Sequence, residues 1–148
     1  MGMNIHSSMN LRSTIAWNGS SADRLEDAVT ALRVFVPTPL PEALCRLIEE
    51  REPRLELIRD HSLLPPQLSE GDHTGDPAFR RTPDQQARFE RLLDEAEALY
   101  GVPDQDPAQL QRTVAANPGL RWVHTTPAGG GAQVKDAALS ADDLERIV

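Results

Sequence analysis

The chain contains little cysteine, few aromatic residues and no long apolar run. Its single cysteine, Cys45, excludes an intramolecular disulfide and a zinc site that needs several cysteines. Aromatic residues make up 4% of the sequence, so a core must be built mainly from aliphatic side chains. No apolar stretch approaches the roughly 20 residues of a membrane-spanning helix, and the N-terminus lacks the basic and then apolar pattern of a secretory signal. These features predict a cytoplasmic protein.

Positive charge is in the minority. The sequence has 15 Lys and Arg residues against 23 Asp and Glu residues, which gives a formal net charge of −8. Because nucleic acids and anionic membranes repel such a surface, neither is expected as a main partner. The length of 148 residues suits one ordinary domain.

Order is expected to begin near residue 31. Residues 1–30 are polar and show almost no apolar periodicity, so we predict a disordered N-terminal extension there. In residues 31–148, short apolar runs alternate with amphipathic stretches, and we assign this part to one domain.

Four short runs have the composition of β-strands. They cover residues 32–36, 54–59, 98–102 and 120–125. Strands that alternate with helices over short connections pair in parallel, with right-handed crossovers. The segment Ile147-Val148 would begin a fifth strand. The pattern therefore predicts an α/β fold with a parallel sheet.

Helices are predicted between these runs. Their apolar positions recur at helical spacing, as Leu40, Ala43, Leu44, Leu47 and Ile48, then Phe89, Leu92, Leu93 and Ala96, then Leu110, Val114 and Ala115. Asp106 before Pro107, and Ser140 before an acidic pair, are helix-start signals. Cys45 is expected to be a buried structural thiol of the first helix. Residues 61–82 are rich in Pro, Gly, Asp and Ser, and predict a long surface loop that is functional or disordered.

The most informative segment follows the fourth strand. Residues 120–133 read Leu-Arg-Trp-Val-His-Thr-Thr-Pro-Ala-Gly-Gly-Gly-Ala-Gln, so a strand-like run ends in two threonines, a proline and three glycines. A backbone without side chains can turn sharply and present bare N–H groups to a ligand. Open α/β sheets bind their ligands at the carboxyl ends of strands. We therefore predict an anion-binding loop here, against the alternative of a merely flexible turn.

The same segment carries a resemblance to a known family. Asn117 to Gly129 reads Asn-Pro-Gly-Leu-Arg-Trp-Val-His-Thr-Thr-Pro-Ala-Gly, and it resembles the fourth strand and substrate loop of the D-isomer-specific 2-hydroxyacid dehydrogenases. The order of the upstream strands also fits, so the resemblance covers residues 32–148. It implies the N-terminal part of the substrate-binding domain, with a flavodoxin-like open parallel sheet, helices on both faces and an end at about the fifth strand.

The resemblance also implies substrate-binding residues. Members of the family hold the substrate carboxylate with the backbone N–H groups of a small residue and the Gly after it, which here are Ala128 and Gly129. From their place beside this loop, Thr125 and Thr126 are expected either to donate hydrogen bonds to the substrate or to cap the end of the strand and the loop. Family members continue with an apolar residue and an Asp or Asn, whereas residues 130–133 read Gly-Gly-Ala-Gln. The loop conformation and the substrate class therefore stay open.

The cofactor and the catalytic residues are not found in this chain. NAD or NADP serves the family, yet residues 1–148 contain no Gly-x-Gly-x-x-Gly fingerprint. The family's catalytic Arg, Glu and His follow the segment that this chain matches. We therefore assign no catalytic, cofactor-binding or metal-binding residue and expect the chain alone to be inactive and to bind no cofactor. The implied substrate is a small carboxylate, and the intact enzyme is expected to be a homodimer.

A stand-alone flavodoxin-like module that binds a ligand or regulates a partner, without enzymatic activity, is the main alternative. A response regulator would need an acidic pair after the first strand and a phosphorylatable Asp after the third. Pro37-Thr38-Pro39 follows the first strand, which counts against this version, whereas Asp104 follows the third and leaves it open. A domain that only mediates protein interactions is a third possibility.

Overall fold

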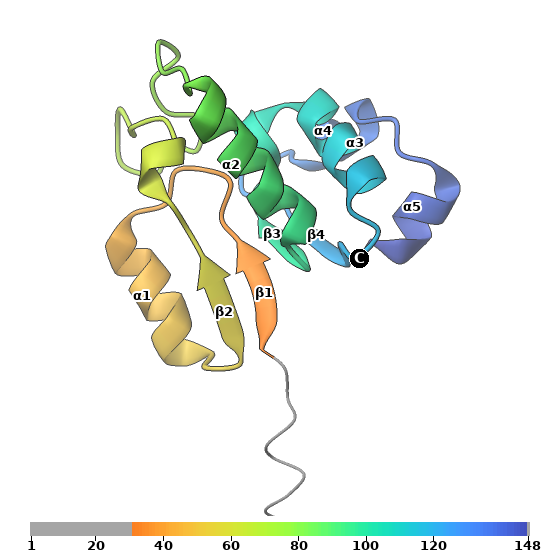
Figure 1. Cartoon of the computed structure of the whole chain (residues 1–148), viewed down its shortest axis with the longest axis horizontal. Helices are drawn as coiled ribbons and strands as arrows, with labels where there is room; N and C mark the ends of the chain where they lie inside the picture. The colour runs from red at the N-terminus through yellow and green to blue at the C-terminus, as the bar shows by residue number, and fades with distance from the viewer. Residues whose placement is uncertain (1–30, 148) are drawn as a thin grey trace, which may run out of the picture.

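A parallel sheet forms the centre of the molecule. The structure is a computed structural model in which residues 31–147 are described, so the extension predicted at residues 1–30 lies outside the described residues. Within that range, β1 (Leu32–Phe35), β2 (Leu55–Ile58), β3 (Ala98–Tyr100) and β4 (Trp122–His124) form one sheet in the order β2-β1-β3-β4, with every pair parallel (Figure 1). This order is that of a flavodoxin-like open sheet, and the predicted fold class is confirmed.

The helices connect and cover these strands. They are α1 (Glu42–Arg51), the 3₁₀ turn η1 (His61–Leu63), α2 (Pro83–Glu95), the 3₁₀ turn η2 (Pro103–Gln105), α3 (Pro107–Ala116), α4 (Gly131–Asp136) and α5 (Ala141–Arg146). The three longer helices occur where the sequence predicts them, whereas α4 lies in a segment expected to be loop. Among the described helices, none combines the length and the apolar character needed to cross a membrane.

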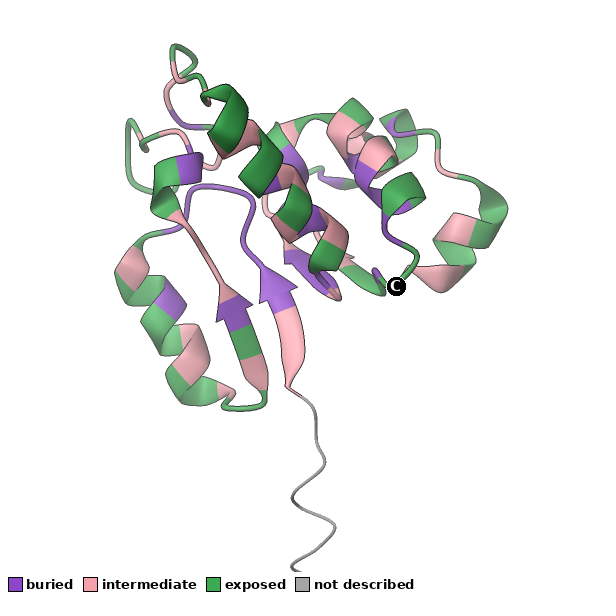
Figure 2. Ribbon diagram, in the orientation of Figure 1, coloured by how far each residue is buried: buried purple, intermediate pink, exposed green. Residues whose placement is uncertain are grey.

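Helices lie on both faces of the sheet because successive strand residues point to opposite sides. Phe35 and Leu99 pack on one face with the apolar residues of α2 and α3, and Phe89 meets Phe35 edge-on with ring centroids 5.7 Å apart. The neighbouring residues Val34 and Ala98 pack on the other face with Cys45 of α1. Consecutive residues of β1 and β3 are therefore buried (Figure 2). The prediction that Cys45 is buried is confirmed, since it is 0% exposed.

Local capping explains where the helices begin. The Thr82 hydroxyl accepts a hydrogen bond from the N–H of Gln85, and the Gln85 side chain accepts one from the N–H of Thr82, which is a reciprocal capping box. Asp106 caps α3 and Ser140 caps α5, as predicted. Each cap satisfies N–H groups that the first helical turn leaves without partners.

Four expected core positions are wrong, because Ala43, Leu44, Leu47 and Ala115 are exposed. Leu44 and Leu47 are 46% and 43% exposed, because α1 turns Cys45 toward the sheet and carries these leucines on its outer side. Ala115 is exposed, because α3 packs through Leu110, Thr113 and Val114. In both helices the apolar stripe is wide enough to suit two orientations, and tertiary packing selects one.

The fifth strand stays a prediction. Ile147 has extended backbone angles (φ −105°, ψ 116°) but pairs with no strand among residues 31–147. Val148 lies outside the described residues.

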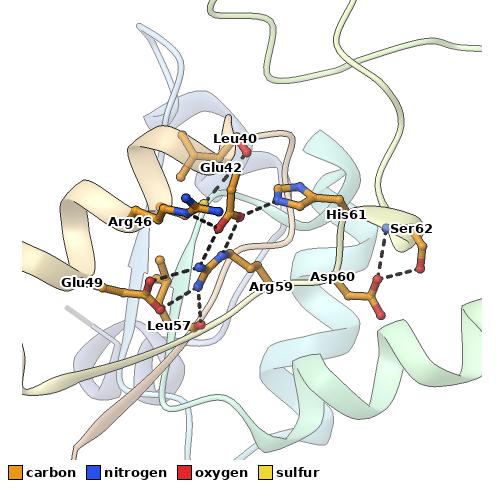
Figure 3. A network of polar contacts seen from close by, with 10 residues as sticks. Leu40, Glu42, Arg46, Glu49, Leu57, Arg59, Asp60, His61 and Ser62 are labelled. Carbon is orange, nitrogen blue, oxygen red and sulfur yellow. Dashed lines mark hydrogen bonds and ion pairs between the residues drawn. The ribbon is translucent and has the colours of Figure 1, made fainter.

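An ionic network joins the start of α1 to the end of β2. The Glu42 carboxylate accepts hydrogen bonds from Nε and Nη2 of Arg59 at 2.9 and 3.0 Å, and from Nε of Arg46 at 3.1 Å. His61 Nε2 lies 3.0 Å from the same carboxylate, and Arg59 also binds Glu49 (Figure 3). Arg59, His61 and Arg46 together hold the pKa of Glu42 well below its usual range. Glu42 is therefore ionised at neutral pH.

This network predicts a stability that falls in acid. A carboxylate whose pKa is lowered by folding stabilises the native state above its unfolded pKa of about 4.3, and that contribution is lost as the pH falls toward the folded pKa. We expect the free energy of unfolding, measured with urea, to decrease below about pH 4.5, and Glu42→Gln to decrease less over the same range. Glu50→Gln, on the exposed side of α1, is the control, and its free energy of unfolding should decrease with falling pH as steeply as that of the wild type. Equal slopes for Glu42→Gln and wild type would contradict this role.

Candidate functional site

The loops after β1, β3 and β4 lie at one edge of the sheet, because all strands run in the same direction. The strand order reverses between β1 and β3, and such a switch point is where open α/β sheets place a ligand crevice. In this protein a side chain fills the crevice at the switch point. Thr38, in the loop after β1, is 2% exposed, and its hydroxyl donates to the carbonyl oxygen of Tyr100 at 3.4 Å.

Gly101 permits this close approach. Its φ is +119°, and a Cβ placed on it would lie 2.5 Å from Cγ2 and 2.6 Å from Oγ1 of Thr38. Only glycine meets both conditions, because it has no side chain and tolerates positive φ. The Thr38–Gly101 contact therefore closes the switch point, whereas the loop after β4 stays open to solvent.

The loop after β4 presents free backbone donors. Gly130 N–H donates to the carbonyl of Pro127 at 3.1 Å, and Ala132 N–H donates to that of Gly129 at 2.9 Å, which forms a tight turn. Within residues 31–147, the N–H groups of Ala128 and Gly129 form no hydrogen bond, and both residues are exposed. Gly129 has φ +84°, and a Cβ placed on it would meet no atom within 4 Å. These two N–H groups are therefore available to an anion.

The two threonines of the predicted site have different positions. The Thr125 side chain packs where a Cβ on Gly130 would stand, so glycine is required at position 130. The Thr126 hydroxyl is buried and has no hydrogen-bond partner among the described residues. In this conformation Ala128 and Gly129 face solvent, whereas the Thr126 hydroxyl does not.

Gln133 ties the glycine loop to the loop after β3. Its Nε2 donates to the carbonyl oxygen of Gln105 at 3.2 Å and to Oε1 of Gln105 at 3.0 Å. Its own Oε1 is buried without a partner in the described part of the chain. A role for Gln133 could not be predicted from the sequence, because its partner is 28 residues away.

Gln105 and its neighbour Asp104 are strained. Both have φ of +53°, in the left-handed region, where the backbone of a non-glycine residue is about 1 kcal/mol less stable than in the right-handed region. Asp104 is held by Arg81, whose Nη1 and Nη2 donate to its two carboxylate oxygens at 2.9 and 2.7 Å. The Arg81 side chain is 8% exposed, lies 3.6 Å over the Phe89 ring, and donates from Nε to the carbonyl of Leu63 at 2.6 Å. These contacts fasten the predicted long loop to the sheet edge.

The same contacts bear on the response-regulator alternative. Both carboxylate oxygens of Asp104 are bound by Arg81, and the loop after β1 contains Thr38 between two prolines in place of an acidic pair. Among the residues that the structure describes, no group of three His, Cys, Asp or Glu side chains is placed to hold a metal ion.

Comparison of the chain with family models, with curated proteins and with solved structures finds no match.

Substitution at Gly101 tests the closed switch point. Gly101→Ala should lower the free energy of unfolding by more than about 2 kcal/mol, because it adds backbone strain and a collision with Thr38. Gly71→Ala is the matched control, since Gly71 has φ +78° but no atom within 4 Å of the added Cβ. The free energy of unfolding of Gly71→Ala should fall by only about 1 kcal/mol.

Adding Thr38→Ala to Gly101→Ala should recover part of the loss, which urea denaturation of the double-mutant cycle measures. Equal losses for the two glycine variants, or additive effects in the cycle, would contradict the contact.

Proposed function

We propose that this chain is the substrate-binding portion of an NAD(P)-dependent oxidoreductase that acts on the CH–OH group of small 2-hydroxy acids, and that reduces 2-oxo acids in reverse. The observation that carries the proposal is the pair of exposed N–H groups of Ala128 and Gly129, which have no partner within residues 31–147. They stand at the carboxyl edge of a flavodoxin-like sheet, where such folds bind ligands. The resemblance of residues 117–129 to the family's substrate loop supports the same assignment.

The chemistry of the loop suits a carboxylate. Two neighbouring backbone N–H groups at a glycine turn form a concavity that binds an anion without a charged side chain. Hydrogen bonds to a charged acceptor are about twice as strong as neutral ones and fix the direction of the carboxylate. A carboxylate held in this way orients the adjacent carbinol or carbonyl carbon for reaction. The role that we assign to Ala128 and Gly129 is therefore binding and orientation.

The described residues do not fit a dinucleotide cofactor. The turn after β1 contains Pro37, Pro39 and Pro41, and proline has no N–H to offer a pyrophosphate at the start of α1. Thr38 also fills the crevice at the switch point. In the proposal the cofactor and the proton-transfer groups lie outside these 148 residues, so we derive no hydride-transfer step for this chain. We further propose that the intact enzyme is a homodimer, as the resemblance implies, and that it is cytoplasmic, as the sequence pattern predicts.

A ligand titration tests the proposal. Pyruvate or oxamate, added to the ¹⁵N-labelled chain, should shift the amide signals of Ala128 and Gly129 and saturate. Gly129→Val should weaken the affinity roughly tenfold or more. Valine does not tolerate the φ of +84° at this position, so the two N–H groups are displaced, and charge-assisted hydrogen bonds are worth about 1.5–3 kcal/mol. Gly71→Val, which carries the same change at another positive φ, is the control and should bind as wild type does.

The chain alone should not reduce pyruvate with NADH, because the proposal places the hydride carrier elsewhere. Amide shifts that are absent, or that lie away from residues 125–131, would contradict the binding site. Reduction of pyruvate by the purified chain would contradict the division of roles.

A further inference from the structure

A second hollow lies between the loops that follow β1 and β2, at the other end of the carboxyl edge. It has a volume of about 480 Å³, within the range of ordinary small-molecule sites. Most of its wall is apolar, formed by Leu40, Leu64, the Phe79 ring and four prolines of the two loops. Flat rings and prolines offer stacking surfaces but few polar groups. The few polar side chains in this wall therefore decide what it binds.

His61 is held in one orientation at this hollow. Its Nε2 lies 3.0 Å from the Glu42 carboxylate, and Arg59 and Arg46 keep that carboxylate ionised. A carboxylate accepts hydrogen bonds and does not donate them, so the neutral imidazole carries its hydrogen on Nε2. Nδ1 is then an acceptor, and no residue of the described range forms a hydrogen bond with it.

The other polar groups in the wall also present acceptors. Gln67 donates from Nε2 to the carbonyl of Asp72 at 2.8 Å, which directs its amide oxygen away from that bond. Ser62 donates its hydroxyl hydrogen to Asp60 at 2.6 Å and keeps only lone pairs. Acceptors therefore outnumber donors in this wall, since one N–H of Gln67 is the only donor left among these side chains, and a ligand that brings a hydrogen-bond donor suits it best.

The charge of the surroundings favours an uncharged ligand. Glu42 and Glu49 are paired with Arg46 and Arg59, so the four charges next to His61 cancel. A cation would approach the two guanidinium groups, and an anion would find no free positive group in this network. Neither gains the attraction that would offset its desolvation.

We propose that this hollow binds a flat, uncharged heteroaromatic ligand, which stacks on Phe79 and the prolines and donates a ring N–H to Nδ1 of His61. The site lies on the β1 and β2 side of the edge and involves none of residues 125–131, so it does not depend on the proposed function. It assigns His61 and Glu42 a joint role, in which Glu42 sets the tautomer and His61 contacts the ligand.

Indole and 1-methylindole are the probes, since they share one flat ring system but only indole has an N–H. Added to the ¹⁵N-labelled full chain at about pH 8, indole should shift signals of residues 39–42, 61–67 and 79. Its affinity should exceed that of 1-methylindole about threefold to tenfold, which is the worth of one hydrogen bond.

Two variants separate the stacking from the hydrogen bond. His61→Phe keeps a flat ring but removes Nδ1, so it should bind both probes with equal affinity. Phe79→Ala removes part of the wall and should weaken both probes while preserving their ratio. Thermal unfolding of each variant checks that it is folded, and Leu68→Ala, an exposed position of the same loop, serves as the unaffected control.

Equal affinities of the two probes for wild type, or a preference for indole that survives His61→Phe, would overturn the assignment of His61. Amide signals that shift only outside these loops, or a titration that does not saturate at millimolar probe, would contradict a binding site in this hollow. A carboxylate ligand that shifts residues 125–131 leaves this result unaffected, so the two proposals fail separately.

Discussion

Parallel pairing of the strands is the constraint on which the rest of the structure depends. Because β1 pairs with both β2 and β3, and β3 with β4, every strand ends at the same edge. Residues far apart in sequence, such as Thr38 and Gly101, thereby meet within van der Waals contact. The glycine loop, the closed switch point and the His61 hollow all lie at this edge. Reversal of one strand would move the loop that follows it to the opposite edge and separate the residues of these features.

Much of the fold follows from local sequence, and the exceptions share a cause. The strands, the proline and acidic caps and the buried face of α2 are set by residues within a few positions of one another. The orientations of α1 and α3 are not, because the apolar stripe of each helix is wide. Packing against the sheet buries Cys45 rather than Leu44 in α1, and it leaves Ala115 of α3 exposed. The short helix α4 was also missed, since its glycines favour a loop and its stability comes from packing.

The candidate site also has features that local sequence predicts and contacts that it does not. Ala128 and Gly129 could be predicted because a glycine turn after a strand is a local pattern. The pairing of Arg81 with Asp104 could not, because these residues are 23 positions apart and the aspartate adopts a left-handed conformation that its sequence does not demand. The pairing of Gln133 with Gln105 was hidden by a similar separation. Sequence therefore indicated the donors of the site but not the contacts that hold them.

The two surfaces at this edge have opposite hydrogen-bonding character. Ala128 and Gly129 offer donors to an anion, whereas the wall around His61 offers acceptors to an uncharged donor. One ligand class does not suit both, so they would be occupied independently.

The central claim is that the glycine loop holds a carboxylate through its backbone. A crystal structure of the chain grown with oxamate tests this most directly. The account predicts carboxylate oxygens within about 3 Å of the amide nitrogens of Ala128 and Gly129, with the turn from Pro127 to Gly130 unchanged. Oxamate bound elsewhere, or a loop in which these two N–H groups pair with the protein, would contradict it.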